Sequence, residues 1–140
     1  MKKTLLFLFL FLTGLFFSQT VSNKKHDVLF HVISDTLKNK QKTSVAILKD
    51  STFYTIENVN GRNRRGGMLA YITKNGDVHD ATNGIVGNIG ERKITGKNGV
   101  VLGYVYSEYG YVMDNGKTIV AYFDVPINTK IVALMVFFGY

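Results

Sequence analysis

Three arginines within four residues are the most chemically suggestive feature of the chain. Arg62, Arg64 and Arg65 lie between Gly61 and Gly66. A guanidinium group binds phosphate or carboxylate through two parallel hydrogen bonds, so the segment predicts a flexible cationic loop that binds an anionic partner. An acidic glycan or an anionic lipid headgroup suits such a loop, and a solvated loop without a partner is the alternative. The spacing matches neither a phosphate-binding loop nor a dinucleotide-binding fingerprint.

Four tyrosines form a second group of candidates. Tyr104 and Tyr106 are two residues apart, and so are Tyr109 and Tyr111. Residues with this spacing share a face when they lie on a β-strand. Exposed tyrosines in a row can stack on sugars or contact a partner, because each ring offers a large amphipathic area at low entropic cost. Packing between neighbouring strands, at roughly 0.2–1 kcal/mol for each aromatic pair, is the structural alternative.

Asp77 and His79 share a strand face by the same spacing. A histidine beside a carboxylate can act as a general base or as a pair of metal ligands. No serine or cysteine nucleophile motif accompanies the pair, and no third ligand is evident; His26 and His31 lie in a distant segment. We therefore expect a solvated pair, and the sequence predicts no catalytic residue, no metal site and no cofactor.

The elements that must position these residues are predicted from a repeated phrase between residues 52 and 123. Each copy has an apolar segment, then Asn-Gly, then another apolar segment. Asn followed by Gly tolerates the two positive φ angles of a two-residue hairpin turn, so the pattern predicts an all-β fold of short hairpins. The Asn-Gly pairs begin at Asn60, Asn75, Asn83, Asn98 and Asn115.

Hairpin units of roughly 15–18 residues are too short to bury a face individually, so they must share one core. We assign this β-hairpin repeat domain to residues 45–140 and expect about five units in it. Residues 19–44 precede it as an N-terminal segment or linker. There Asp27 can cap a helix, or Val28–Ile33 can form a strand, because periodicity does not decide so short a run.

The C-terminal residues 131–138 are apolar throughout. A run that is apolar on both faces predicts a central strand covered on both sides. It is too short to span a membrane as a helix, which needs roughly 20 residues. An exposed apolar tail is the alternative, and it would suit a membrane-associated or self-assembling protein.

The N-terminus has the features of a signal peptide. Lys2 and Lys3 precede an almost wholly apolar stretch at residues 5–17. That length falls within the range of a signal-peptide core and short of a membrane helix. We predict a signal peptide at residues 1–18 with cleavage near Ser18, and export to the periplasm or out of the cell. The chain has no cysteine, which excludes a lipid-modified cysteine after the signal and any disulfide in the exported fold.

The charge is mildly basic. The whole chain has a formal net charge of +7, and removal of Lys2 and Lys3 with the signal peptide leaves 15 basic and 10 acidic residues, or +5. Such a charge favours solubility and weak attraction to anionic surfaces. Since the chain is predicted to be exported, we do not expect nucleic acid as its partner.

The turn rhythm resembles that of the five-fold β-flower domain, found in small exported proteins of Bacteroidetes-type bacteria. The closest match is residues 76–89, which read GDVHDATNGIVGNI, with Asn83 where the family has its second glycine. Residues 99–105 resemble the second half of this rhythm, residues 110–114 the first half, and residues 133–138 the phenylalanine-rich end. The likeness covers about residues 46–138 and implies a β-flower-like fold and export. It implies no activity, because none is assigned to the family.

The sequence thus predicts an exported, non-enzymatic β-repeat module that binds an anionic glycan, a lipid headgroup or a protein of the envelope. Arginines and tyrosines gathered on one face would support this function. A membrane-associated or self-assembling structural protein requires residues 131–138 to be exposed. A small hydrolase requires Asp77 and His79 to converge with other polar groups in a cleft.

Overall fold

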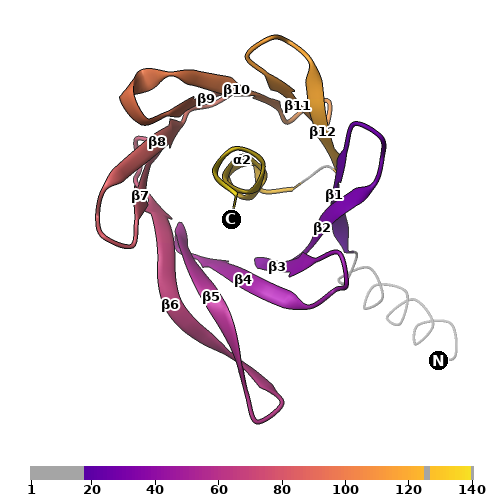
Figure 1. Cartoon of the computed structure of the whole chain (residues 1–140), viewed down its shortest axis with the longest axis vertical. Coiled ribbons are helices and arrows are strands. Elements are labelled where there is room, and N and C mark those ends of the chain that lie inside the picture. The colour runs from indigo at the N-terminus through magenta and orange to yellow at the C-terminus, as the bar shows by residue number, and fades with distance from the viewer. Residues whose placement is uncertain (1–17, 125–126, 140) are drawn as a thin grey trace, which may run out of the picture.

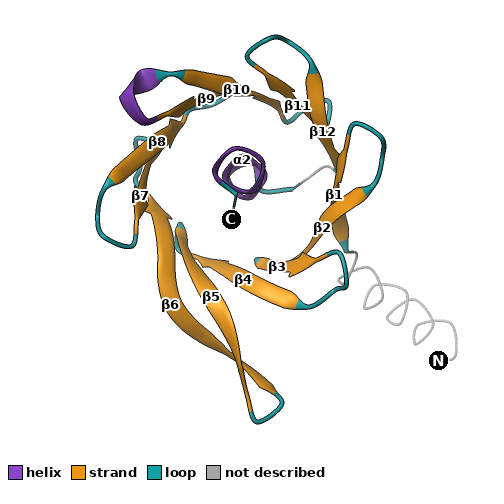
Figure 2. Cartoon of the chain, in the orientation of Figure 1, coloured by secondary structure: helices purple, strands orange, loops and turns teal. Residues whose placement is uncertain are grey.

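The computed structural model describes residues 18–124 and 127–139. Within them, twelve antiparallel strands form a closed barrel in which each strand pairs with its neighbours in sequence, and the last pairs with the first (Figure 1). One helix runs along the axis of this ring of strands (Figure 2). The all-β hairpin fold predicted from the sequence is confirmed. The predicted signal peptide lies outside the described residues, apart from Ser18.

The twelve strands form six consecutive hairpins, of which four lie wholly within residues 45–140, where about five units were expected. Each hairpin consists of an odd-numbered strand and the even-numbered strand that follows. The strands are β1 (Gln19–Asn23), β2 (Val28–Ile33), β3 (Thr36–Asn39), β4 (Ser44–Lys49), β5 (Thr52–Val59), β6 (Arg62–Ile72), β7 (Asp77–Asp80), β8 (Ile85–Ile89), β9 (Lys93–Gly96), β10 (Val101–Tyr106), β11 (Tyr111–Asp114) and β12 (Ile119–Phe123). A short 3-10 turn, η1 (Lys97–Gly99), joins β9 to β10.

Residues 19–44 belong to the ring and are not a linker. The helix alternative is wrong, because Val28–Ile33 is strand β2 and residues 40–43 are only the turn between β3 and β4. Strand β1 closes the ring by pairing with β12, with Val21 opposite Phe123. Asp124 strengthens the closure, since its carboxylate accepts hydrogen bonds from the backbone N–H of Thr20 at 2.7 Å and from its hydroxyl at 2.8 Å.

Each hairpin places one pair of facing residues on the inside of the ring. The odd strand contributes a large apolar residue and the even strand, except at Phe30, contributes Ala or Gly. The pairs are Val21 with Phe30, Leu37 with Ala46, Phe53 with Ala70, Val78 with Gly87, Ile94 with Gly103 and Val112 with Ala121. The register shifts beside this pair in all six hairpins. A β-bulge bends a strand and increases its twist, so the repeated irregularity accounts for hairpin tips that curl away from the ring.

Most turns at these tips are not the two-residue Asn-Gly turns that the sequence predicted. Four of them share another geometry, in which an Asn or Asp side chain accepts a backbone hydrogen bond from the turn. Asn60-Gly61 has the two expected positive φ angles, 53° and 75°. The turn after Asp80 instead holds three residues, of which the last, Asn83, is left-handed (φ 68°). The backbone N–H groups of Thr82 and Gly84 donate to the Asp80 carboxylate at 2.9 Å each. Asn23, Asn39 and Asp114 accept backbone hydrogen bonds in the same way, with left-handed residues at His26, Lys42 and Lys117.

The apolar C-terminal run forms a helix, and the predicted central strand is wrong. Helix α2 (Thr129–Phe138) begins at Asn128, whose side chain accepts a hydrogen bond from the backbone N–H of Lys130, and ends at Gly139 (φ 72°). The run is apolar all round because strands surround it on every side, and such a helix shows no amphipathic period. In the described part of the chain, no helix is long and apolar enough to cross a membrane.

Small residues on the ring wall make room for this helix. A Cβ atom placed on Gly87 would lie 2.5 Å from the Phe138 ring, and one on Gly103 would lie 2.6 Å from the Phe137 ring. Residues 131–134 of the helix are buried, and no polar side chain is buried among the described residues. The interior is therefore an apolar core, and the tail that the membrane-associated alternative required to be exposed is packed inside the ring.

Candidate functional site

The arginine segment lies on a strand and not in a loop. Arg62, Arg64 and Arg65 open β6, and they pair across the hairpin with Val59, Glu57 and Ile56 of β5. Strand β4 pairs with β5 only as far as Thr55, and β7 pairs with β6 only as far as Ala70. Residues 56–69, which we call the arm, therefore pair only with each other and project from the ring at the bottom of Figure 1.

One arginine of the arm is fixed against the ring wall. The guanidinium of Arg65 lies over the Tyr54 ring, 4.6 Å from its centroid, an arrangement worth about 0.5–1 kcal/mol at an exposed site. Arg64 and Arg65 also line a groove of about 200 Å³ between the arm and the β3–β4 hairpin. The other lining residues are Thr36, Ser44, Ile47, Ile56 and Asn63.

The structure brings three of the four candidate tyrosines together on the outer wall. Tyr106 of β10 pairs across the strands with Tyr111 of β11, and their ring centroids are 5.0 Å apart. Tyr109, in the connecting turn, stacks on Tyr111 at 6.0 Å with an interplanar angle of 18°. Tyr104 lies on the same face of β10 and, among the described residues, makes no ring contact with this group.

Sequence reasoning missed two aromatic neighbours that extend the group. Tyr122 of β12 lies directly across from Tyr111, and its ring stacks on His26 at 4.8 Å with an interplanar angle of 19°. We call Tyr106, Tyr109, Tyr111, Tyr122 and His26 the tyrosine row. Tyr122 could have been found from the repeat. It follows the small inner residue Ala121, as Tyr104 follows the small inner residue Gly103 in the preceding hairpin.

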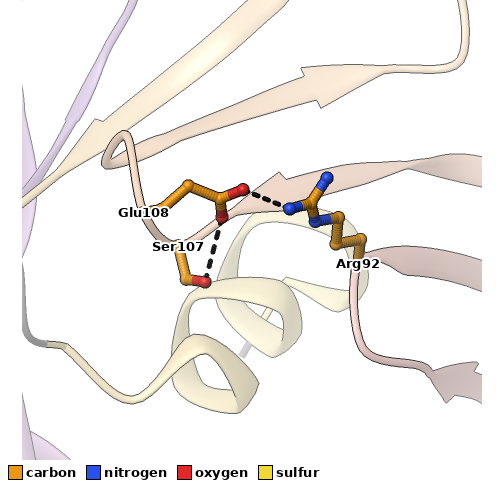
Figure 3. A network of polar contacts seen from close by, with 3 residues as sticks. All are labelled: Arg92, Ser107 and Glu108. Atoms are coloured by element: carbon orange, nitrogen blue, oxygen red, sulfur yellow. Dashed lines mark hydrogen bonds and ion pairs between the residues drawn. The ribbon is translucent and has the colours of Figure 1, made fainter.

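One end of the tyrosine row meets an exposed ion pair. Arg92 lies over Tyr106, 5.6 Å from the ring centroid, and forms an ion pair with Glu108 (Figure 3). The hydroxyl of Ser107 donates to the same carboxylate at 3.4 Å. Because the Arg92 and Glu108 side chains are 58% and 38% exposed, the pair adds only about 0–1 kcal/mol to stability. It links the β8–β9 turn to the β10–β11 turn beside the row.

The predicted arginine and tyrosine candidates do not share a face. The arm belongs to β5 and β6, the tyrosine row lies on β10–β12, and strands β7–β9 separate them along the ring. The gathering of arginines and tyrosines on one face, which would have supported a single binding surface, is not found, and the structure presents two separate surfaces.

Asp77 and His79 do not converge. The Asp77 carboxylate accepts a hydrogen bond from the Asn88 amide at 2.9 Å, whereas the His79 ring stacks on Tyr71 at 4.6 Å. A groove of about 390 Å³ passes Asp77 and Asn88, but His79 does not line it. Among the described residues, no group of three or more His, Cys, Asp or Glu side chains is placed to hold a metal ion.

One carboxylate has a shifted pKa, and its cause is structural. The hydroxyl of Thr82 donates to the Asp80 carboxylate at 2.7 Å, and the backbone N–H of Gly84 donates to the same oxygen. Hydrogen bonds to the charged form lower the pKa of Asp80 below its ordinary value. This carboxylate holds a turn in place.

Comparison with known proteins adds no family. No protein-family model, no curated protein and no solved structure matches the chain.

Proposed function

We propose that the protein is an exported, non-enzymatic module that binds a partner in the cell envelope or outside the cell. The tyrosine row carries this proposal. It lies on the outer wall, where it is not needed to fill the core, and Tyr109 is 69% exposed. Tyrosine is enriched at the centres of interfaces because a rigid ring with a polar tip buries much area at low entropic cost.

Export is the second part of the proposal, and it is supported by the sequence. Lys2 and Lys3 ahead of the apolar residues 5–17 give the pattern of a secretory signal. A periplasmic or secreted location follows from it. The likeness to the β-flower family is likewise a proposal, supported by hairpins that surround a shared core, with six hairpins in place of five.

The absence of an enzymatic role is also proposed, and two observations support it. The polar pair Asp77 and His79 points to different partners. The tyrosine row offers stacking and hydrogen-bonding groups but no activated nucleophile. Recognition is therefore the function that its chemistry fits best.

A crosslinking experiment tests the proposal. Tagged protein is crosslinked in its own cell-envelope fraction, with Tyr109→Ala and Tyr111→Ala variants and with Tyr104→Ala as the matched control on the same face of β10. We expect capture of a specific partner to fall at least tenfold in the two row variants, because hot-spot side chains contribute about 2 kcal/mol or more. Equal capture by all variants would show that the row is only a packing feature.

A further inference from the structure

The arm is the one hairpin that departs from a regular repeat. The inner facing residues are nine positions apart in five hairpins, as for Val21 and Phe30 (30 minus 21), but 17 apart for Phe53 and Ala70 (70 minus 53). The third hairpin therefore holds eight extra residues, four on each side. At about 3.3 Å per residue, they carry the tip roughly 13 Å beyond its neighbours. Closing the ring does not require this extension.

The arm is cationic, and its one carboxylate, Glu57, lies directly across from Arg64 without forming an ion pair. The arm has three arginines and one carboxylate, Glu57. Within the described residues, the one ion pair joins Arg92 to Glu108, so no arginine of the arm is paired. An isolated two-stranded hairpin is marginally stable in water, and of the three arginines only Arg65 has a stabilising contact, with the Tyr54 ring. The sequence of the arm is therefore better explained by a ligand than by folding.

The groove at the base of the arm defines the chemistry of that ligand. Arg64 and Arg65 both line the groove, and arginine suits a carboxylate, whereas the hydroxyl residues Ser44 and Thr36 suit sugar hydroxyl groups. Ile47 and Ile56 give the groove an apolar side, against which the C–H groups of a sugar ring can pack. Its volume of about 200 Å³ lies below the roughly 300–1,000 Å³ of a drug-sized pocket, so it suits one sugar unit.

We propose that the arm and its groove bind an acidic polysaccharide, with the carboxylate of one sugar unit held by Arg64 and Arg65 and the chain continuing along the arm past Arg62. Arg62 and Arg64 are two residues apart on β6, so they lie roughly 7 Å apart along the strand. This row of charges favours a linear polyanion over a single small ion. The surface is separate from the tyrosine row, and the inference does not depend on it.

The composition of the arm tip argues against a lipid surface as the ligand. Side chains that enter the headgroup region are typically aromatic or aliphatic. The tip instead presents Asn58, Asn60, Gly61 and Asn63 beside a single exposed aliphatic side chain, Val59, and the Asn58 side chain accepts a hydrogen bond from the backbone N–H of Gly61 at 3.0 Å. Such amides offer hydrogen bonds to hydroxyl groups but no anchor in a membrane.

Titration calorimetry with defined probes tests this inference. The purified protein is titrated with polygalacturonate oligomers, with their methyl-esterified counterparts, and with phosphatidylglycerol vesicles. The variant R64Q/R65Q is compared with K93Q/K97Q, which removes the same charge from the distant β9–β10 hairpin. We expect R64Q/R65Q to weaken polygalacturonate binding at least tenfold, K93Q/K97Q to change it less than twofold, and esterification to abolish it.

Three outcomes would overturn the inference: equal losses in both double variants, binding of the methyl ester as tight as that of the acid, or binding of vesicles without binding of polygalacturonate. The ester probe uses the unmodified protein, so the test stands even if R64Q/R65Q folds poorly. Failure here leaves the proposed function intact, because partner capture that depends on Tyr109 is measured independently.

Discussion

Replacing Gly103 by Ala should destabilise the ring far more than the addition of one methyl group suggests. A Cβ atom at Gly103 would lie 2.1 Å from the Met113 carbonyl oxygen and 2.6 Å from the Phe137 ring. The first contact is with backbone, which cannot rotate away. Overpacking of this kind costs about 1–3 kcal/mol, and we expect the upper part of that range. Alanine also restricts the unfolded chain, which offsets about 0.4–1 kcal/mol and leaves a net loss near 2 kcal/mol.

Gly96→Ala is the matched control on the other strand of the same hairpin. Its backbone is extended (φ −82°), and the nearest atoms to an added Cβ are those of Leu102 at 3.4 Å. Gly96→Ala therefore restricts the unfolded chain as Gly103→Ala does, but it introduces no clash in the folded state. Urea unfolding can be followed by the fluorescence of the chain's eight tyrosines, since it has no tryptophan. With a slope of about 1–3 kcal/mol per molar urea, a 2 kcal/mol loss lowers the midpoint by roughly 1 M.

A double-mutant cycle separates the two contacts. Phe137→Leu removes the ring atoms that the new methyl group would meet but leaves the Met113 carbonyl in place. We expect Gly103→Ala to cost about 1 kcal/mol less in this background, within the usual range for residues in contact. If Gly103→Ala and Gly96→Ala shift the midpoint equally, the helix does not pack against this wall as described.

Four further outcomes follow from the fold. Leu134→Ala, at a fully buried helix position, should cost about 2–5 kcal/mol in urea unfolding, and a loss below 1 kcal/mol would place α2 outside the core. Gly76→Ala should cost more than Gly99→Ala, because both have positive φ but only Gly76 would also place Cβ 2.3 Å from a carbonyl oxygen; the reverse order of melting temperatures would contradict the turn assignment. Asp114→Ala should cost about 1 kcal/mol by removing the acceptor for the backbone N–H of Thr118, and no loss of stability would mean that this turn needs no side-chain acceptor. The pKa of the Asp80 carboxylate is lowered on folding, so the stability that Asp80 contributes is present above the ordinary aspartate pKa and is lost as the pH falls through the folded-state pKa. An NMR titration midpoint for Asp80 at or above 3.8 would refute this.

The sequence predicted the hairpins because their turn chemistry is local. Asn60-Gly61 took the predicted conformation, since both positive φ angles depend on those two residues alone. A longer signal was available and was missed. An Asn or Asp precedes a left-handed residue by three positions at Asn23, Asn39, Asp80 and Asp114. This spacing, with inner residues such as Val21 and Leu37 sixteen positions apart (37 minus 21), places residues 19–44 in the ring.

The C-terminal element could not be predicted from its own residues. A run that is apolar at every position has no period, so a buried strand and a fully enclosed helix look alike. What distinguishes them is tertiary: the glycines at positions 87 and 103 leave space on the wall for Phe138 and Phe137. Every strand of the closed ring already has two neighbours in the ring, so the apolar run fills the axis as a helix.

The sequence predicted which residues form the candidate surfaces but not how those residues are placed relative to one another. Glycines around Arg62–Arg65 suggested a loop, yet the extra residues lengthen both β5 and β6 and so form a hairpin. The tyrosines were recognised by their spacing, but Tyr122 joins them from the next strand, and neighbours across strands depend on register. The arginines and tyrosines form two separate surfaces because strands β7–β9 lie between them in the ring.

The most direct test of the recognition function is hydroxyl-radical footprinting of the protein in its own cell-envelope fraction. Tyr109 is 69% exposed in the free protein, so its modification rate should be high and easily measured. The account predicts that the partner protects Tyr109 and Tyr111 while the modification of Tyr104 stays unchanged. An unchanged rate at Tyr109, together with protection elsewhere on the ring, would contradict the assignment of the tyrosine row as the binding surface.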